Sequence, residues 1–379
     1  MLSRRLVKTM NKIWISIDAR ETCCVLSCMN GGIRTIIARL DYNQPAPNTK
    51  KTIGNIDYSL WEVDTNKRLD KNYDHFIQVF NWCNWVIEKT FQEKEFVFLI
   101  VLPCFLSHDK YKLIEAAAKE TDLELSLNYS PSATSLFCEE LHIQNTARVL
   151  TLFISDTFSE ISCAEIGDGV YEILSKLSCR FDDIDINKRA VTLDYLIRQN
   201  INLAETDASD YDYIVVTGDQ NKFIELKPAI VNTLKRDPNS INFVPDASSY
   251  GGAILSGIFS GVVKDNLLLN VSNYGLDLNI KKRGSNKIVT EELVSANISI
   301  PKIKKLNFVL NESIDSLSVI QTHNYVSKGH LKQSRCLIEK NILGRLDKNY
   351  LSKKSREEGS IIITTCINTD GSLNLSIEG

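Results

Sequence analysis

The chain has 379 residues, of which 43% are hydrophobic and 24% are charged, and its net charge is −3 at pH 7. This length exceeds what one hydrophobic core usually supports, so we expect at least two domains. The balanced charge argues against nucleic acid or an anionic membrane surface as a partner. The apolar run Phe96–Leu106 is too short to span a bilayer and contains Pro103, so we expect no membrane association.

The ten cysteines raise the question of a metal site or of disulfides. No Cys-x-x-Cys pair occurs, and the closest cluster, Cys23, Cys24 and Cys28, lies in an alternating segment whose adjacent thiols would point to opposite faces. We therefore expect no metal, and free thiols in a reducing compartment. Met1–Lys12 is basic but lacks the apolar core of a secretory signal, which favours the cytoplasm, with an organelle matrix as the alternative.

Apolar spacing and turn signals predict a first α/β half before residue 142. The expected elements, in chain order, are strands at Ile13–Ile17 and Cys23–Cys28, a helix at Asp74–Phe91, a strand at Phe96–Pro103, a helix at Asp109–Thr121, a strand at Leu123–Leu127 and a helix at Pro131–Leu141.

A second half follows with a similar order. The expected elements are a hairpin of Val149–Ser155 and Glu160–Ile166, a strand at Val170–Leu174, a helix at Ile186–Arg198, a strand at Tyr213–Val216 and a helix at Lys222–Leu234. Hairpins followed by alternating helices and strands, twice over, predict the duplicated actin-like ATPase fold of the α/β class. Two unrelated α/β domains are the alternative.

After Leu269 the pattern changes to short alternating runs, which predict an antiparallel β-sandwich. These runs are Ile298–Ile300, Leu306–Leu310, Ser318–Thr322, Ile361–Ile367 and Leu373–Ile377, with a hairpin turn at Asp370-Gly371. Lys348–Gly359 is charged and has no apolar residue after Leu351, so we expect a mobile loop there.

The stretch Val244–Ile280 joins the two patterns. Tyr250–Ala253 places small residues where a helix begins, which would let the backbone approach a bound group closely. Leu267, Leu268 and Leu269 form an apolar run between polar breaks that either docks on a neighbouring surface or enters a sheet. This combination resembles the DnaK-type heat-shock chaperone family, at the end of its nucleotide-binding domain, its hydrophobic interdomain linker and its first substrate-domain strand.

The resemblance implies three parts. Residues 13–263 correspond to an actin-like nucleotide-binding domain, residues 264–272 to the interdomain linker, and residues 273–379 to a peptide-binding β-sandwich without the helical lid. The adenine-clamping subdomain is largely missing, because the short polar segment Ile201–Asp212 stands in its place.

The resemblance also assigns site residues. It implies nucleotide-binding positions at Asp18, Thr22, Gly218 and Asp246, a catalytic lysine at Lys50, linker positions at Leu267, Leu268 and Leu269, and peptide-pocket positions at Val289 and Ile320. The implied cofactor is ATP or ADP with magnesium.

The departures from the family motifs argue against ATP chemistry. Phosphate loops bind through backbone N–H groups at positions that only glycine allows. In the first loop, Ser16–Val25, the family's Gly-Thr is replaced by Arg20 and Glu21, which bring a bulky side chain and an anion to the phosphate position. In the second loop, Ser155–Phe158 replaces a glycine-rich run. We expect weak or absent ATP binding and hydrolysis.

Three functions remain open at this point. The first is a heat-shock-type chaperone that binds extended apolar segments of unfolded clients with a J-domain co-chaperone. Because Phe181–Ile186 (FDDIDI) resembles a motif of the HscA branch, this function extends to iron–sulfur cluster assembly with a scaffold protein. The second is a nucleotide-independent peptide-binding or scaffold module, and the third is a small-molecule kinase on the actin-like fold.

Overall fold

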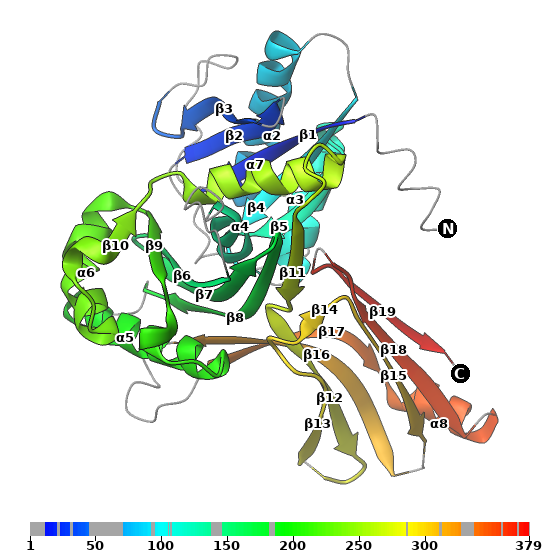
Figure 1. Ribbon diagram of the computed structural model, residues 1–379. Helices are drawn as coiled ribbons and strands as arrows, with labels where there is room; N and C mark the ends of the chain where they lie inside the picture. The colour runs from blue at the N-terminus through cyan, green and yellow to red at the C-terminus, as the bar shows by residue number, and fades with distance from the viewer. Residues whose placement is uncertain are drawn as a thin grey trace. The chain divides into compact units, whose positions relative to one another are not determined.

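The structure is a computed structural model that describes residues 12–20, 23–30, 33–44, 71–91, 95–104, 106, 108–137, 146–181, 186–285, 287–310, 313–326, 337–357, 359–369 and 371–378. It divides into two compact units, Met1–Leu268 and Leu269–Gly379 (Figure 1). The expected α/β class is confirmed in its general form, because mixed sheets with helices and purely antiparallel sheets are both present.

The first unit begins with a five-stranded sheet in the order β3-β2-β1-β4-β5. Its strands are β1 (Ile13–Ala19), β2 (Cys23–Asn30), β3 (Ile33–Asp41), β4 (Phe96–Leu102) and β5 (Leu125–Tyr129). The first three form an antiparallel meander, whereas β4 runs parallel to β1 and β5 parallel to β4. Helices α2 (Lys71–Thr90) and α3 (His108–Glu120) belong to this half. Phe76, Val79, Phe80 and Cys83 give α2 a continuous buried face at helical spacing.

A second sheet repeats this topology, in the order β10-β9-β6-β7-β8. Its strands are β6 (Ala147–Ile154), β7 (Phe158–Gly167), β8 (Val170–Arg180), β9 (Tyr213–Gly218) and β10 (Ile241–Phe243). Again a meander is followed by two parallel strands. The helices α5 (Ile186–Leu203) and α6 (Gln220–Leu234) occupy the chain positions of α2 and α3. The two halves are therefore copies of one arrangement.

Each half ends in a helix that packs on the sheet of the other half. The helix α4 (Ser130–Leu136) contacts β6, β7 and β8, while α7 (Ala247–Ser260) contacts β1, β2 and β3, and the two helices also contact each other. A Cβ atom at Gly251 would collide with the carbonyl oxygen of Ala133, and one at Gly252 with the hydroxyl of Ser16. These glycines lie within α7 and let it pack closely on neighbouring parts of the protein. The expectation that they let the backbone approach a bound group is therefore wrong.

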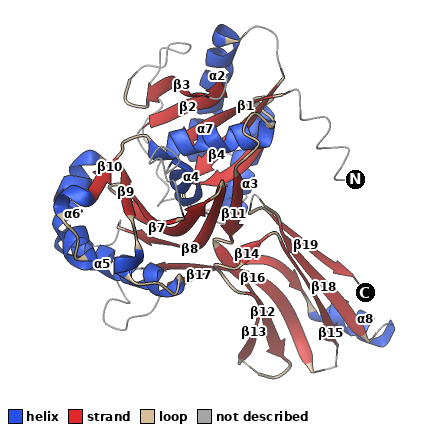
Figure 2. Ribbon diagram, viewed as in Figure 1, coloured by secondary structure: helices blue, strands red, loops and turns tan. Residues whose placement is uncertain are grey.

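The second unit is built almost entirely of antiparallel strands (Figure 2). One sheet has the order β13-β12-β16-β17 and the other β15-β18-β19. The strands are β12 (Tyr274–Lys282), β13 (Ile288–Val294), β15 (Lys302–Val309), β16 (Ile314–Val326), β17 (Leu337–Leu346), β18 (Ser360–Ile367) and β19 (Leu373–Glu378). Leu276 and Leu317 from the first sheet share one buried core with Ile361 and Ile363 from the second. Two antiparallel sheets therefore share one core in this unit, and the β-sandwich stays a prediction.

The leucine run enters a strand rather than forming an irregular connection. Leu267–Val271 is strand β11, which pairs with β14 (Ser299–Ile300) through Asn270 and Val271. The backbone N–H of Leu267 donates to the carbonyl of Gly169, and the side chain of Leu267 is about half exposed. The boundary between the units lies directly after Leu268. The interdomain-linker role of Leu267, Leu268 and Leu269 stays a prediction.

The prediction of a mobile loop over Lys348–Gly359 is wrong for most of this segment. Lys348–Glu357 forms helix α8. Asp347 precedes the helix and its carboxylate accepts the backbone N–H of Tyr350 at 2.9 Å, which is the capping geometry that starts a helix. The single apolar residue Leu351 is buried in the core of the second unit. The cap at Asp347 and the buried side chain of Leu351 therefore both favour a helix in this charged segment.

None of the helices among the described residues has the length and apolar character needed to cross a membrane. The eight cysteines described are all free thiols, and no group of three potential metal ligands is found within the same residues.

The anchoring of α8 gives a stability test. Leu351→Ala removes a buried side chain and should destabilise the second unit by about 2–4 kcal/mol. Tyr350→Ala is the matched control, because this side chain is 38% exposed and its loss should cost less than about 1 kcal/mol. All four tryptophans precede residue 86, so hydrogen exchange in β16 and β18 is the suitable measurement. Equal effects of both variants would contradict the anchoring role.

Candidate functional site

The ends of two equivalent strands face one cavity in the first unit. Arg20 directly follows β1, and Ser155 directly follows β6. Arg20 N–H donates to the carbonyl of Cys23, and Ser155 N–H donates to that of Phe158, both at 2.9 Å. The cavity has a volume of about 290 Å³. Its lining consists of Arg20, Cys23, Arg39, Phe153, Ser155, Asp156, Gly218, Asp219, Gln220 and Asn221.

The guanidinium of Arg20 binds Asp18 at the end of β1. Its Nε and Nη2 atoms donate to Asp18 Oδ2 at 2.9 and 2.7 Å. The side chains of Arg20 and Asp18 are only 10% and 3% exposed. Burial acts to lower the pKa of the Arg20 guanidinium, but the interactions with Asp18, Cys23 and Asp246 together outweigh it, so that the net pKa is raised and the charge is held.

The same guanidinium reaches the segment that begins α7. Nη1 donates to the carbonyl of Pro245 at 2.9 Å and lies 3.3 Å from Asp246 Oδ1. Nη2 donates to the hydroxyls of Ser248 and Ser249 at 3.3 and 3.0 Å. All three nitrogens of the guanidinium therefore have acceptors. Asp246 also forms an ion pair with Arg39 on β3.

One oxygen of the Asp18 carboxylate is correspondingly saturated. Oδ2 accepts hydrogen bonds from the hydroxyls of Ser248, at 2.8 Å, and Ser249, in addition to two from Arg20. A carboxylate oxygen with four donors has no lone pair left for a magnesium ion or its water shell. Arg20 thus occupies the position between Asp18 and Asp246 where the resemblance places phosphate and magnesium.

The second hairpin is also unsuited to phosphate. Phe153 stands two residues before Ser155, as Asp18 stands before Arg20, and its ring stacks on Phe158 with centroids 5.3 Å apart. Asp156 adds a carboxylate to the cavity wall. Hydrogen bonds from Arg189 and Lys222, each 3.1 Å away, lower the pKa of Asp156 and keep it ionised. Both of these cations are therefore already paired with Asp156.

Gly218 has a structural reason to be glycine. Its φ is +105°, and a Cβ atom there would collide with the carbonyl oxygen of Ile154. The next residue, Asp219, donates its N–H to the same carbonyl at 2.7 Å. Asp219 also caps α6, because its carboxylate accepts N–H groups from Asn221 and Lys222. Gly218 is therefore required by the backbone, and its presence is not by itself evidence for a nucleotide site.

A buried charge cluster that the sequence analysis missed lies in the same unit. Glu160 on β7 and Lys176 on β8 are 0% and 4% exposed. Glu160 accepts the backbone N–H of Cys104, and Lys176 donates to the Ser132 hydroxyl at 3.3 Å. Burial lowers the pKa of Lys176 to about 8, while the fields of Cys104 and Glu160 oppose the shift. The sequence did contain a signal for this cluster, because Glu160 and Lys176 each stand at an inward-facing position of an apolar strand.

The structure brings some of the predicted nucleotide positions together. Asp18 and Asp246 are joined through Arg20, and Gly218 lines the same cavity. Thr22 and Lys50 lie outside the described residues. Residues 182–185 of the FDDIDI motif are also outside them.

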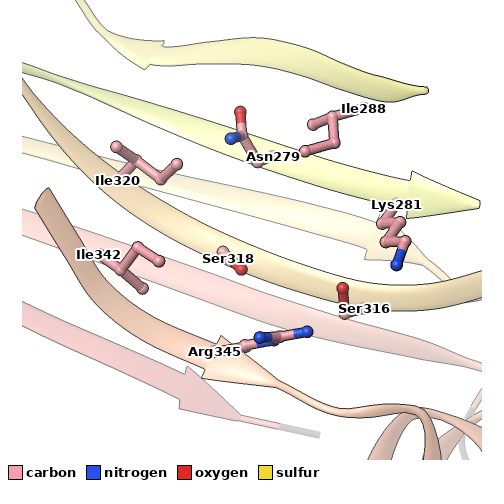
Figure 3. A pocket seen from close by; sticks show the side chains of 8 residues that line it. All are labelled: Asn279, Lys281, Ile288, Ser316, Ser318, Ile320, Ile342 and Arg345. Carbon is pink, nitrogen blue, oxygen red and sulfur yellow. The ribbon is translucent and has the colours of Figure 1, made fainter. Parts of the chain in front are cut away.

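A second cavity, of about 450 Å³, lies on the outer face of the sheet β13-β12-β16-β17 in the second unit. Figure 3 shows its lining. The residues are Asn279, Lys281, Ile288, Ser316, Ser318, Ile320, Ile342 and Arg345. It combines three isoleucines with two cations and three small polar side chains.

The two predicted peptide-pocket residues do not share this cavity. Ile320 lines it. Val289 pairs with Ile280, which packs against the core of the second unit, whereas its neighbour Ile288 lines the cavity. Because successive residues of a strand point to opposite faces, Val289 and Ile320 lie on opposite sides of the sheet. The peptide-binding role of each stays a prediction.

No protein-family model matches this chain. The resemblance to DnaK-type chaperones therefore rests on the motifs quoted from the sequence.

The Arg20 network predicts a large loss of stability on its removal. Arg20→Gln leaves the Asp18 carboxylate buried without a cation, which should destabilise the first unit by about 3 kcal/mol. Arg198→Gln is the matched control, because Arg198 forms an ion pair with Asp194 while 54% exposed, and its loss should cost below about 0.5 kcal/mol. Urea unfolding followed by tryptophan fluorescence measures both. A cost for Arg20→Gln as small as the control's would contradict the network.

The close approach of Gly218 to Ile154 predicts a difference in stability between two glycine-to-alanine variants. Gly261 also has a positive φ, +76°, but open space around its Cβ position. Gly261→Ala should cost about 1 kcal/mol from backbone strain alone. Gly218→Ala adds the collision with Ile154 and should cost at least about 3 kcal/mol. Similar unfolding midpoints for the two variants would show that the close approach is not needed.

Proposed function

We propose that this chain is a nucleotide-independent peptide-binding protein related to DnaK-type chaperones. In this proposal the first unit is an actin-like ATPase framework that no longer binds ATP or ADP with magnesium. The second unit binds extended segments of client proteins on the outer face of its sheet β13-β12-β16-β17.

The duplicated topology supports the actin-like assignment. Both halves of the first unit have a three-stranded meander followed by alternating helices and parallel strands, and the strand order in the two sheets is the same. The exchange of α4 and α7 between the halves adds to this argument, because two unrelated domains would have no reason to exchange equivalent helices.

The single observation that carries nucleotide independence is the set of contacts made by Arg20. A phosphate group would have to displace the guanidinium from Asp18, Asp246 and the two serines. Each hydrogen bond to a charged group contributes about 1.5–3 kcal/mol. Removal of the guanidinium would also leave two carboxylates facing an anionic ligand, which is unfavourable in a buried site.

The cavity on the outer sheet of the second unit supports peptide binding. The side chains of Ile288 and Ile342 are 52% and 59% exposed there, and Ile320 pairs with Ile342 on the same face. Exposed branched side chains on a sheet provide a surface for an extended segment. A J-domain co-chaperone and an iron–sulfur scaffold protein are implied by the resemblance alone and stay predictions.

The nucleotide part is tested by calorimetric titration of the full chain with magnesium and ADP or ATP. We expect no binding stronger than about 1 mM. A fluorescent Leu-Pro-Pro-rich peptide should bind with the same affinity with and without magnesium and ATP. Micromolar binding of ADP would contradict nucleotide independence.

The peptide part is tested with Ile342→Ser, which should weaken binding of the same peptide about tenfold by removing an apolar contact. Ile303→Ser on β15 is the control, because Ile303 is similarly exposed, at 63%, but lies in the other sheet. Unchanged binding in both variants would exclude this face as the peptide site.

A further inference from the structure

The cavity on the outer face of the sheet β13-β12-β16-β17 has a polar centre. Ser316 and Ser318 on β16 point outward together with Asn279 on β12, which pairs with Ser318. Thr290 donates to Asn279 Oδ1 at 2.8 Å, which leaves the amide group and the two hydroxyls as donors toward the cavity. An apolar peptide side chain placed over these groups would remove water from them without replacing its hydrogen bonds. The centre of the cavity therefore favours a polar group that accepts hydrogen bonds.

Two cations flank this polar centre. Lys281 pairs with Ser316 from one side of β16, and Arg345 pairs with Ser318 from the other. Figure 3 shows Lys281, Ser316 and Arg345 toward one end of the cavity and Ile320 with Ile342 toward the other. Arg345 is exposed and makes no hydrogen bond or ion pair with any residue that the structure describes.

The neighbouring carboxylates offset this charge only in part. Asp315 lies 3.7 Å from Lys281, in an ion pair whose partners are 41% and 33% exposed, whereas no ion pair to Arg345 is found among the described residues. Asp277 and Glu292 lie at the opposite end, since Asp277 pairs with Ile320 and with Glu292. Neither lines the cavity. The cationic end is complementary to an anion.

The register of the sheet gives the spacing that a ligand must match. Ile320 is two residues from Ser318, in the row of Arg345, and four residues from Ser316, in the row of Lys281. Residues two apart in a strand are separated by about 6.5–7 Å. An extended peptide lying along β16 would reach both groups with side chains two or four positions apart.

We infer that this cavity selects extended segments in which an acidic residue stands two or four positions from a branched apolar residue. The carboxylate binds between Arg345, Lys281 and the serine hydroxyls, and the apolar side chain packs on Ile320 and Ile342. This inference rests on the proposed peptide-binding function. It replaces the expectation of a purely apolar client with a mixed acidic and apolar one.

The test compares three labelled eight-residue peptides that differ at one position. The first has Asp two residues before an Ile-x-Ile sequence, the second has Asn there, and the third has Lys. Fluorescence anisotropy with the full chain at low salt should show binding of the Asp peptide about tenfold tighter than the Asn peptide, and weakest for Lys. About 0.5 M salt should reduce the difference.

Charge-removing variants identify the residues responsible. Arg345→Gln and Lys281→Gln should each weaken the Asp peptide about three- to tenfold and leave the Asn peptide unchanged. Lys304→Gln is the matched control, because Lys304 is exposed on β15 in the other sheet. All three positions are on the surface, and equal unfolding midpoints would show that folding is unaffected.

The outcomes separate this inference from the proposed function. If the Asn peptide, or a Leu-Pro-Pro-rich peptide, binds as tightly as the Asp peptide, the acidic selectivity is wrong and peptide binding stands. If none of the peptides binds, the proposed peptide-binding function fails, and the selectivity with it.

Discussion

The ion-paired network of Arg20 is the constraint on which the first unit depends. One guanidinium joins Asp18 at the end of β1 to Asp246 and the serines that begin α7. These groups come from opposite ends of the unit's sequence, so their bonds also hold α7 on the first sheet. Here a side chain of the protein supplies the positive charge, so the ligand-free state needs no counterion.

The internal duplication makes the two hairpins directly comparable. The first has Asp18 and Arg20, while the second has Phe153 and Ser155 at the equivalent places. The first hairpin therefore carries a neutralised ion pair and the second an aromatic stack. The buried pair of Glu160 and Lys176 shows the same outcome again, because each buried carboxylate has an internal cation nearby. In both halves, a buried carboxylate therefore has a cation of the protein near it.

Much of the fold could be predicted from the sequence, because strand alternation and helical spacing are local signals. The repeated order of strands and helices in the first unit and the paired runs of the second are examples. The helix at Lys348–Glu357 was missed because Leu351 is a single apolar residue, whose burial depends on the distant strands β16 and β18. The side-chain contacts of Arg20 were equally out of reach, since Pro245 and Ser249 are more than 220 residues away in the chain. The face of the sheet on which Val289 lies could not be predicted without knowing that Val289 pairs with Ile280. Thr22 and Lys50 lie outside the described residues.

The exchanged helices have a consequence for how the chain is synthesised. The first sheet is complete in sequence at Tyr129, yet the helix that covers it, α7, begins only at Ala247. During translation the face of β1 and β2 that α7 covers therefore stays exposed while more than a hundred further residues are added, at an elongation rate of about 5–20 residues per second. The core that β1 and β4 form with α2 and α3 lies almost entirely within the amino-terminal half, whereas the opposite face of the sheet is covered only after the second half has been synthesised.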